Sequence, residues 1–173
     1  MEKVITRAVI VFPMRKRSVL LAFKPETVET AGKIGTDCWN GYGGEIESGE
    51  TAAQAAAREL FEESKLRSQP KHFEKVAEIA FHNQTLDGSF FTCTCDVFIV
   101  RIWEGTAKGT ETMRTPTWFH VSKLPLDRMM PADKTWVPLA LNGWKIIGHA
   151  WYGPRQKMLL QPTRVKYVSG FAS

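Results

Sequence analysis

The feature that most constrains the fold is a glycine-rich segment followed directly by a helix-forming run, at residues 39–66. Its sequence is WNGYGGEIESGETAAQAAARELFEESKL. Thr51 followed three residues later by Gln54 is typical of a capping box, and the alanine-rich run after it has high helix propensity. The sequence therefore predicts a helix that begins at Ala52, preceded by a loop that ends at Glu50.

The predicted helix carries a cluster of carboxylates. Glu59, Glu62 and Glu63 are related by i+3 and i+4, which places them side by side on one helix face. Like charges at this spacing repel unless they surround a cation, and clustered oxygen ligands suit Mg²⁺ or Mn²⁺. The pattern therefore predicts a divalent metal site. The alternative is an amphipathic surface helix whose glutamates are simply solvated.

The opposite stripe of this helix is predicted to pack on a sheet, because its residues are small or apolar: Ala53, Ala56, Ala57 and Leu60. The glycines ahead of the helix are expected to let the backbone turn tightly; they are Gly41, Gly43 and Gly44.

The spacing of these residues resembles the signature of the Nudix hydrolases. The matching positions are Gly44, Glu50, Arg58-Glu59-Leu60 and Glu62-Glu63. The resemblance implies metal binding by Glu59, Glu62, Glu63 and the Gly43 carbonyl, and an orienting ion pair between Arg58 and Glu50. Lys65 stands where the family has glycine. A left-handed lysine past a helix end costs roughly 1 kcal/mol, so this departure affects stability and not the metal.

The whole chain has the size and composition of one soluble globular domain, residues 1–173, with 43% hydrophobic and 24% charged residues. No apolar run has the length of a membrane span, and the N-terminal residues lack a signal-peptide layout, so we expect a cytosolic protein. The net charge of +5 suits polyphosphate substrates or nucleic acid, or is a generic basic surface. Cys93 and Cys95 are two residues apart in a predicted strand, so their side chains point to the same face. This favours a place in the core or in a pocket wall over a metal-binding or redox role.

Strands are predicted on both sides of the helix. The expected strands are 4–12, 18–23, 73–81, 90–103 and 117–121, with a closing hairpin from 144–152 and 156–161. Residues 13–17 are expected to form a turn, residues 24–36 a mobile loop, and 133–141 a last helix capped by Asp133. This pattern gives an α+β class. The Nudix resemblance implies an α/β/α sandwich with a mixed central sheet.

Three segments are similar to the MutT-like oxidised-purine nucleoside triphosphatases: WNGYGGEIESGET, MRTPTWF and MMPADKTWVPLAL. In that group an asparagine and two adjacent aspartates bind the base edge and a tryptophan stacks on it. Asn40 and Asp133 match two of these positions, whereas Ala132 and Met130 replace the other aspartate and the tryptophan. Without the resemblance, Asn40 is read as a turn residue and Asp133 as a helix cap.

The same resemblance implies two further site residues. Lys24 matches a lysine near the substrate, and is otherwise a strand-end lysine. Glu111 lies near the position of a further glutamate that assists metal binding, although the register is shifted by one residue.

The resemblance implies Mg²⁺-dependent hydrolysis of oxidised or otherwise modified purine nucleoside triphosphates, such as 8-oxo-dGTP, to the monophosphate and pyrophosphate. We expect a monomer that binds a small nucleotide and has no stable nucleic-acid or membrane partner. One alternative is Nudix chemistry on a nucleotide sugar, ADP-ribose, a dinucleotide or an RNA cap. Another is a non-catalytic nucleotide-binding module.

Overall fold

The structure is a computed structural model that describes residues 4–28, 30 and 34–172. Within these residues the strands are β1 (Arg7–Arg15), β2 (Ser18–Lys24), β3 (Cys38–Asn40), β4 (Tyr42–Glu45), β5 (Phe73–Gln84), β6 (Phe90–Val100), β7 (Arg114–His120), β8 (Ile146–Tyr152) and β9 (Leu159–Tyr167). The helices are α1 (Ala52–Ser64) and α2 (Asp133–Leu141), with short 3-10 turns η1 (Pro70–His72), η2 (Leu126–Arg128) and η3 (Pro154–Gln156).

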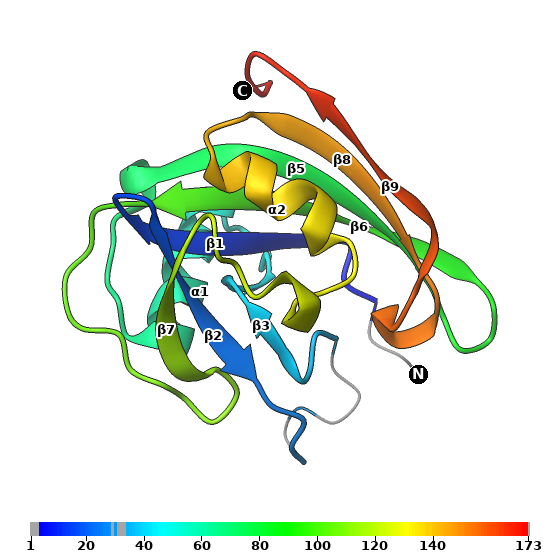
Figure 1. Cartoon of the computed structure of the whole chain (residues 1–173), viewed down its shortest axis with the longest axis horizontal. Helices are drawn as coiled ribbons and strands as arrows, with labels where there is room; N and C mark the ends of the chain where they lie inside the picture. Colours follow the sequence, from blue (N-terminus) through cyan, green and yellow to red (C-terminus); the bar gives the residue numbers. More distant parts are fainter. Residues whose placement is uncertain (1–3, 29, 31–33, 173) are drawn as a thin grey trace.

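The strands form one curled mixed sheet, as Figure 1 shows. Its order is β3-β2-β1-β6-β5-β8-β9, with β4 paired to β1 and β7 paired to β2. The β1–β6 and β5–β8 pairs are parallel, and the remaining pairs are antiparallel. The predicted mixed sheet is therefore confirmed.

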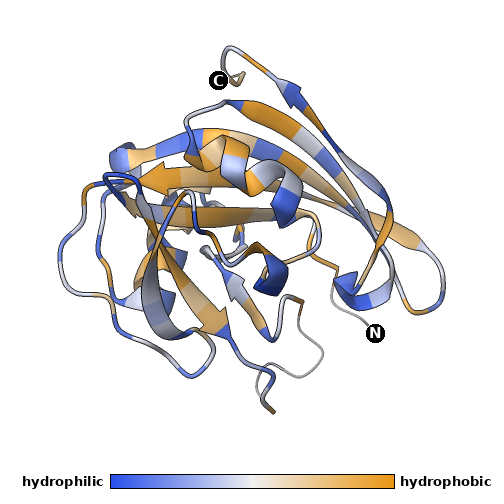
Figure 2. Cartoon of the chain, in the orientation of Figure 1, coloured by the Kyte–Doolittle hydropathy of each residue, from blue (hydrophilic) through white to orange (hydrophobic). Residues whose placement is uncertain are grey.

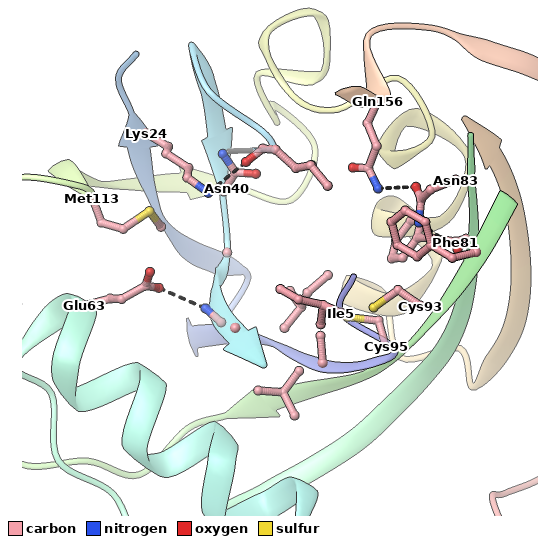
Figure 3. Close-up of a pocket in the computed structure, with 18 residues that line it drawn as sticks. Ile5, Lys24, Asn40, Glu63, Phe81, Asn83, Cys93, Cys95, Met113 and Gln156 are labelled. Carbon is pink, nitrogen blue, oxygen red and sulfur yellow. Dashed lines mark hydrogen bonds between the residues drawn. The ribbon is translucent and has the colours of Figure 1, made fainter. Parts of the chain in front are cut away.

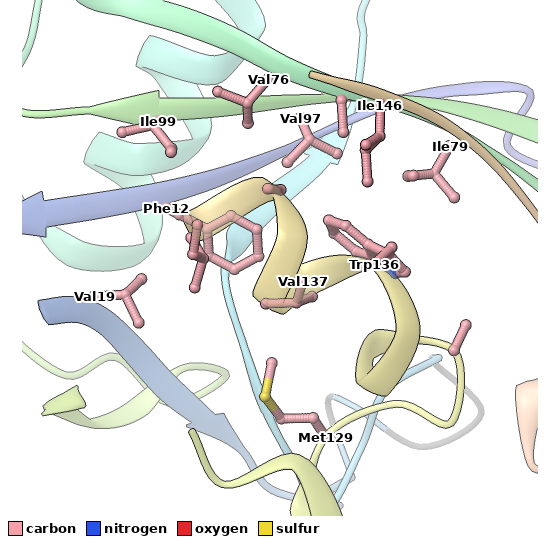
Figure 4. Close-up of a cluster of buried hydrophobic side chains, with 14 of the residues drawn as sticks. Phe12, Val19, Val76, Ile79, Val97, Ile99, Met129, Trp136, Val137 and Ile146 are labelled. Carbon is pink, nitrogen blue, oxygen red and sulfur yellow. The ribbon is translucent and has the colours of Figure 1, made fainter. Parts of the chain in front are cut away.

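The two helices cover opposite faces of this sheet. Successive residues of β1 point to opposite faces, so the strand contributes side chains to the apolar cluster under each helix. Phe12 and Met14 belong to the apolar cluster that also contains Trp136 and Val137 of α2. Val9 and Val11 belong to the cluster on the α1 side. Figure 4 shows the first cluster between α2 and the strands, and Figure 2 shows how strongly apolar β1 and β2 are. This layering confirms the predicted α/β/α sandwich.

The first strand and its turn differ from the prediction. The strand begins at Arg7 and continues through Pro13, which pairs with Val100 of β6. A proline is accepted in a strand where the ladder needs no N–H at that position. The turn is therefore confined to Lys16 and Arg17, and Lys16 has a left-handed φ of 51°. The sequence also did not predict β3 and β4, which are short and lie in the glycine-rich segment.

Helix α1 begins and ends as predicted. Thr51 is the N-cap and forms a capping box with Gln54, and Lys65 at the C-cap has the left-handed φ of 65°. The predicted packing stripe is confirmed for Ala56 and Leu60, which are buried, and for Ala57, which packs against the same core cluster. Ala53 was wrongly included: it is partly exposed, and Ala55 and Ser64 are buried instead.

The last third of the chain follows the predicted order with one error. Asp133 does not cap α2: the N-cap is Ala132, no side chain caps the helix, and Asp133 is its first residue. The predicted stop at Asn142-Gly143 is confirmed by the Asn142 C-cap. The closing hairpin is also present, but β9 continues to Tyr167 and the turn is the 3-10 segment η3.

The predicted loop at residues 24–36 includes positions 29 and 31–33, which lie outside the described residues. Within the described ranges, no helix is long and apolar enough to cross a lipid bilayer.

Candidate active site

The glycines of the site are required for close approach. Gly44 pairs with Val9 and Gly43 pairs with Ile10 in the β1–β4 ladder. A Cβ atom on Gly43 would collide with the Val9 carbonyl oxygen, and one on Gly44 would lie 2.5 Å from Glu59 Oε1. Neither glycine has a positive φ. The predicted turn at these positions was therefore wrong, and the glycines instead let α1 lie directly against β4.

Two helix carboxylates converge on this glycine backbone. Glu63 Oε2 accepts a hydrogen bond of 2.9 Å from the Gly43 backbone N–H, as Figure 3 shows. The Glu59 side chain is only 13% exposed and lies against Gly44. Glu62, one turn from Glu59, has 57% of its side chain exposed. The structure thus brings Glu59 and Glu63 to one edge of β4 and leaves Glu62 at the solvent boundary.

Arg58 organises the acidic residues around it. Its Nε and Nη2 donate to the two oxygens of Glu50 at 2.7 and 2.9 Å, a bidentate pair. Its Nη1 donates to Glu59 Oε1 at 2.7 Å and lies 3.5 Å from Glu62 Oε2. Nη2 also donates to the Glu45 carbonyl oxygen. The Arg58–Glu50 ion pair implied by the resemblance is present, and Arg58 also fixes the direction of the Glu59 carboxylate.

The carboxylates around α1 fall into two groups, one with a lowered pKa and one with raised pKa values. Hydrogen bonds from Arg58 lower the pKa of Glu50 to about 2. Burial raises the pKa of Glu63 to about 7, although the Gly43 N–H opposes the rise, and burial likewise raises the pKa of Glu59. Buried carboxylates whose charge is disfavoured are a donor set that a divalent cation would stabilise.

The helix carboxylates therefore fit a cation site in chemistry. Within residues 4–28, 30 and 34–172, however, no three His, Cys, Asp or Glu side chains lie close enough together to form a preformed metal cluster. Glu111 is exposed in the β6–β7 connection, outside the cavity lining, and makes no hydrogen bond or ion pair within the described part of the chain. The structure does not bring Glu111 to the α1 carboxylates.

A cavity of about 240 Å³ opens beside Glu63. One end is lined by Gly43, Gly44, Glu63, Lys24 and Met113, and the other by Phe81, Asn83, Phe91, Cys93 and Gln156. Figure 3 shows Lys24, Glu63 and Met113 on one side of the cavity and Phe81, Asn83, Cys93 and Gln156 on the other. Lys24 Nζ donates to the Ile34 carbonyl oxygen at 2.8 Å, and its charge lowers the pKa of Glu63. Cys93 and Cys95 both line the cavity, which confirms their prediction as core or pocket wall.

The other predicted substrate residues lie in an adjoining cavity of about 150 Å³. Asn40, Met130 and Asp133 line it together with Trp136. It shares six lining residues with the larger cavity: Ile10, Ile34, Asn40, Gly41, Phe81 and Gln156. The two cavities are therefore adjoining lobes of one recess, with Glu63 at one end.

Asp133 is the acidic residue that lines the smaller lobe, and its pKa is strongly raised. It is 8% exposed, and burial raises its pKa to about 7, although the Met130 backbone N–H, which donates to Oδ2 at 3.2 Å, opposes the rise. Trp136 Nε1–H also favours the charged carboxylate, yet it is buried without a partner at hydrogen-bond geometry in the described residues. The smaller lobe thus contains the Asp133 carboxyl group, which can be protonated or ionised near pH 7, and the Trp136 N–H, which has no hydrogen-bond partner within the described residues.

Sequence reasoning missed two polar residues of the recess, Asn83 and Gln156. Asn83 follows the predicted strand 73–81 on the same face as Ile79 and Phe81, so a polar residue in an otherwise apolar alternation was the available signal. Gln156 carried no such signal, because its position depends on how the η3 turn folds back over β5.

Comparisons with known proteins agree with this architecture. The NUDIX domain model matches residues 3–140. The chain is 34% identical over 148 residues to the oxidized purine nucleoside triphosphate hydrolase of Danio rerio, which covers 86% of this chain and 85% of that protein. It is 35% identical over 138 residues to the protein of the same name from Mus musculus, over 78% of this chain and 85% of that one.

Solved structures share the fold. The MutT protein from Bacillus halodurans superimposes with a TM-score of 0.73 at 20% identity, over 93% of this chain and 97% of that one. The MutT NUDIX hydrolase from Burkholderia pseudomallei gives 0.62 at 17% identity, over 82% and 98%. Because the NUDIX domain model matches most of this chain and the two relatives are more than 30% identical to it, this chain belongs to the Nudix family.

Proposed function

We propose that this protein hydrolyses oxidised or otherwise modified purine nucleoside triphosphates, such as 8-oxo-dGTP, to the monophosphate and pyrophosphate, and so removes damaged nucleotides from the pool. The observation that carries the proposal is one recess whose larger lobe is lined by Glu63, from the same helix as the carboxylates that Arg58 holds, and whose smaller lobe is lined by Asp133. Asn40 lines both lobes. The names of the two relatives, oxidized purine nucleoside triphosphate hydrolases, support the substrate class.

In the proposed reaction a water oxygen attacks a phosphorus atom of the triphosphate, and the bond between that phosphorus and the bridging oxygen of pyrophosphate breaks. A carboxylate of α1 takes the proton from the water. Mg²⁺, or Mn²⁺ in its place, would be held by Glu59, Glu62, Glu63 and the Gly43 carbonyl, and would supply charge neutralisation for the phosphates. Glu50 and Arg58 keep Glu59 in place, through the hydrogen bonds at 2.7 Å.

Lys24 is proposed to bind phosphate oxygens, because it lines the same end of the cavity as Glu63. Glu111 remains a prediction as an auxiliary metal ligand, since reaching the carboxylates would require the loop that carries it to move.

The base is proposed to lie in the smaller lobe, against Asn40, Met130 and Asp133. Both Asn40 side-chain N–H groups already donate to backbone, to the Gly35 and Cys38 carbonyl oxygens at 2.9 and 3.0 Å. Asn40 therefore offers its carbonyl oxygen as an acceptor. With a pKa of about 7, Asp133 can accept as a carboxylate or donate as an acid. Met130 supplies a polarisable but less directional surface than an aromatic ring.

The test is pyrophosphate release with Mg²⁺ from a panel that contains 8-oxo-dGTP, 2-oxo-dATP, O6-methyl-dGTP, the four normal deoxynucleotides and ADP-ribose. We expect the highest kcat/KM for a modified purine triphosphate. Equal rates on all triphosphates would refute the sanitation role, and activity on ADP-ribose alone would refute the substrate class.

We also propose that the protein acts as a cytoplasmic monomer. Sedimentation tests the oligomeric state, and cell fractionation tests the location.

A further inference from the structure

Asn83 is a buried amide at the end of the recess away from Glu63. It is 3% exposed, and its Nδ2 donates to the Phe81 carbonyl oxygen at 2.9 Å. Its neighbours on the same face of β5, Ile79 and Phe81, are apolar. A buried amide in such a row is unfavourable unless its polar atoms are used.

Gln156 lies beside this amide at the same end of the recess. Its Nε2 donates to Asn83 Oδ1 at 2.6 Å, and Figure 3 shows the two side chains pointing toward each other. Gln156 belongs to the η3 turn, where Arg155 and Gln156 have left-handed φ values of 56° and 52°. This conformation is uncommon for residues with a side chain, and such positions concentrate at ligand sites. The strained turn fixes where the Gln156 amide points.

Gln156 also occupies the junction of the recess. It lines the lobe of about 240 Å³, the lobe of about 150 Å³ and a third hollow of about 230 Å³ that Met130 also lines. The Gln156 side chain is therefore within reach of groups bound in either of the first two lobes.

The two amides retain unused hydrogen-bonding capacity. Each side-chain amide has two N–H donors and one acceptor oxygen. Within the described residues, each uses one N–H, and Gln156 Oε1 has no hydrogen-bond donor. Asn40, by contrast, already uses both of its N–H groups on backbone. The unused N–H groups and the Gln156 oxygen can therefore form hydrogen bonds with a bound ligand, in addition to Asp133 and the Asn40 oxygen.

We propose that Gln156 is a specificity-determining residue that reads the exocyclic amino and oxo groups of a purine base, and that Asn83 is its positioning residue. The inference rests on the proposed function and adds to it the group that distinguishes one purine triphosphate from another. A base whose substituents match these donors and acceptor keeps every amide paired. A mismatched base leaves a polar group of the recess without a hydrogen-bond partner. Such unpaired groups give large differences in kcat/KM between two substrates.

The experiment compares kcat/KM ratios in the wild type and in Gln156→Ala. The ratio of dGTP to dITP isolates the 2-amino group, and the ratio of 8-oxo-dGTP to dGTP isolates the 8-oxo group. We expect at least one ratio to change by about tenfold in Gln156→Ala, in line with the loss of one hydrogen bond. Asn83→Ala is expected to change the same ratio in the same direction. Gln69→Ala, an exposed glutamine outside the recess, is the matched control.

Ratios within about twofold of wild type in Gln156→Ala would overturn the proposal. A uniform loss on all substrates would also overturn it, since that is what a merely structural role produces. If the wild-type protein hydrolyses no triphosphate, the proposed function fails and the inference is decided by calorimetric affinities for dGTP and dITP. A changed affinity ratio in Gln156→Ala then supports base reading, and an unchanged one refutes it.

Discussion

Replacing Asp133 with asparagine tests the buried carboxyl of the recess through the pH dependence of stability. Burial raises the pKa of Asp133 from its ordinary value of 3.8 to about 7 in the folded protein. A raised folded pKa means that the folded state binds the proton more tightly, so the stabilisation is complete below pH 3.8 and is lost as pH rises to about 7. At about 1.4 kcal/mol per pH unit, the loss amounts to about 4 kcal/mol.

An asparagine side chain at this position cannot ionise, so the variant escapes this loss. We expect the stability of Asp133→Asn, relative to wild type, to increase by about 1.4 kcal/mol per unit between pH 5 and 7 and to become constant above the folded pKa. Urea unfolding at intervals from pH 5 to 8 measures the difference. Taking the difference removes titrations common to both proteins, including that of Glu63.

Asp127→Asn is the control, because Lys134 lowers the pKa of the exposed Asp127 carboxyl and keeps its titration below this range. A flat difference between Asp133→Asn and wild type across pH 5 to 8 would refute the reasoning that burial keeps Asp133 protonated.

Three further substitutions test the arrangement around α1. Gly44→Ala should lower kcat at least about tenfold with little change in Tm, because the added Cβ would lie 2.5 Å from Glu59 Oε1 and displace that carboxylate; normal steady-state rates would contradict it. Arg58→Lys should lower kcat about tenfold or more at saturating Mg²⁺, since a lysine ammonium cannot hold Glu50 and Glu59 at once. Retained turnover would show that the guanidinium contacts to both glutamates are not needed. Lys65→Gly should stabilise the protein by roughly 0.5 to 1 kcal/mol in urea unfolding, because glycine accepts a φ of 65° without strain; a loss of stability would refute this.

The features of the site that could be predicted from sequence are those set by local spacing. The capping box fixes where α1 begins, and the helical period places Glu59 and Glu63 on one face. The left-handed Lys65 follows from its place just past a helix end. The Arg58–Glu50 pair came from the family resemblance, because Glu50 lies outside the helix and its distance from Arg58 depends on the loop.

Features set by tertiary contact could not be predicted in this way. The role of Gly43 depends on the Val9 carbonyl opposite it, which belongs to a strand more than thirty positions earlier. The N-cap of α2 moved to Ala132 because Asp133 turns its carboxylate back to the Met130 N–H inside the recess. Gln156 joins the site only because the η3 turn folds over β5.

The most direct test of the account is product analysis with 8-oxo-dGTP and Mg²⁺, using wild type and Glu62→Gln side by side. Glu62 is chosen because 57% of its side chain is exposed, so the substitution should leave the circular dichroism spectrum and Tm unchanged. We predict equal amounts of nucleoside monophosphate and pyrophosphate from wild type and no turnover from Glu62→Gln. Release of single phosphates by wild type, or a near-normal rate in Glu62→Gln at saturating Mg²⁺, would contradict it.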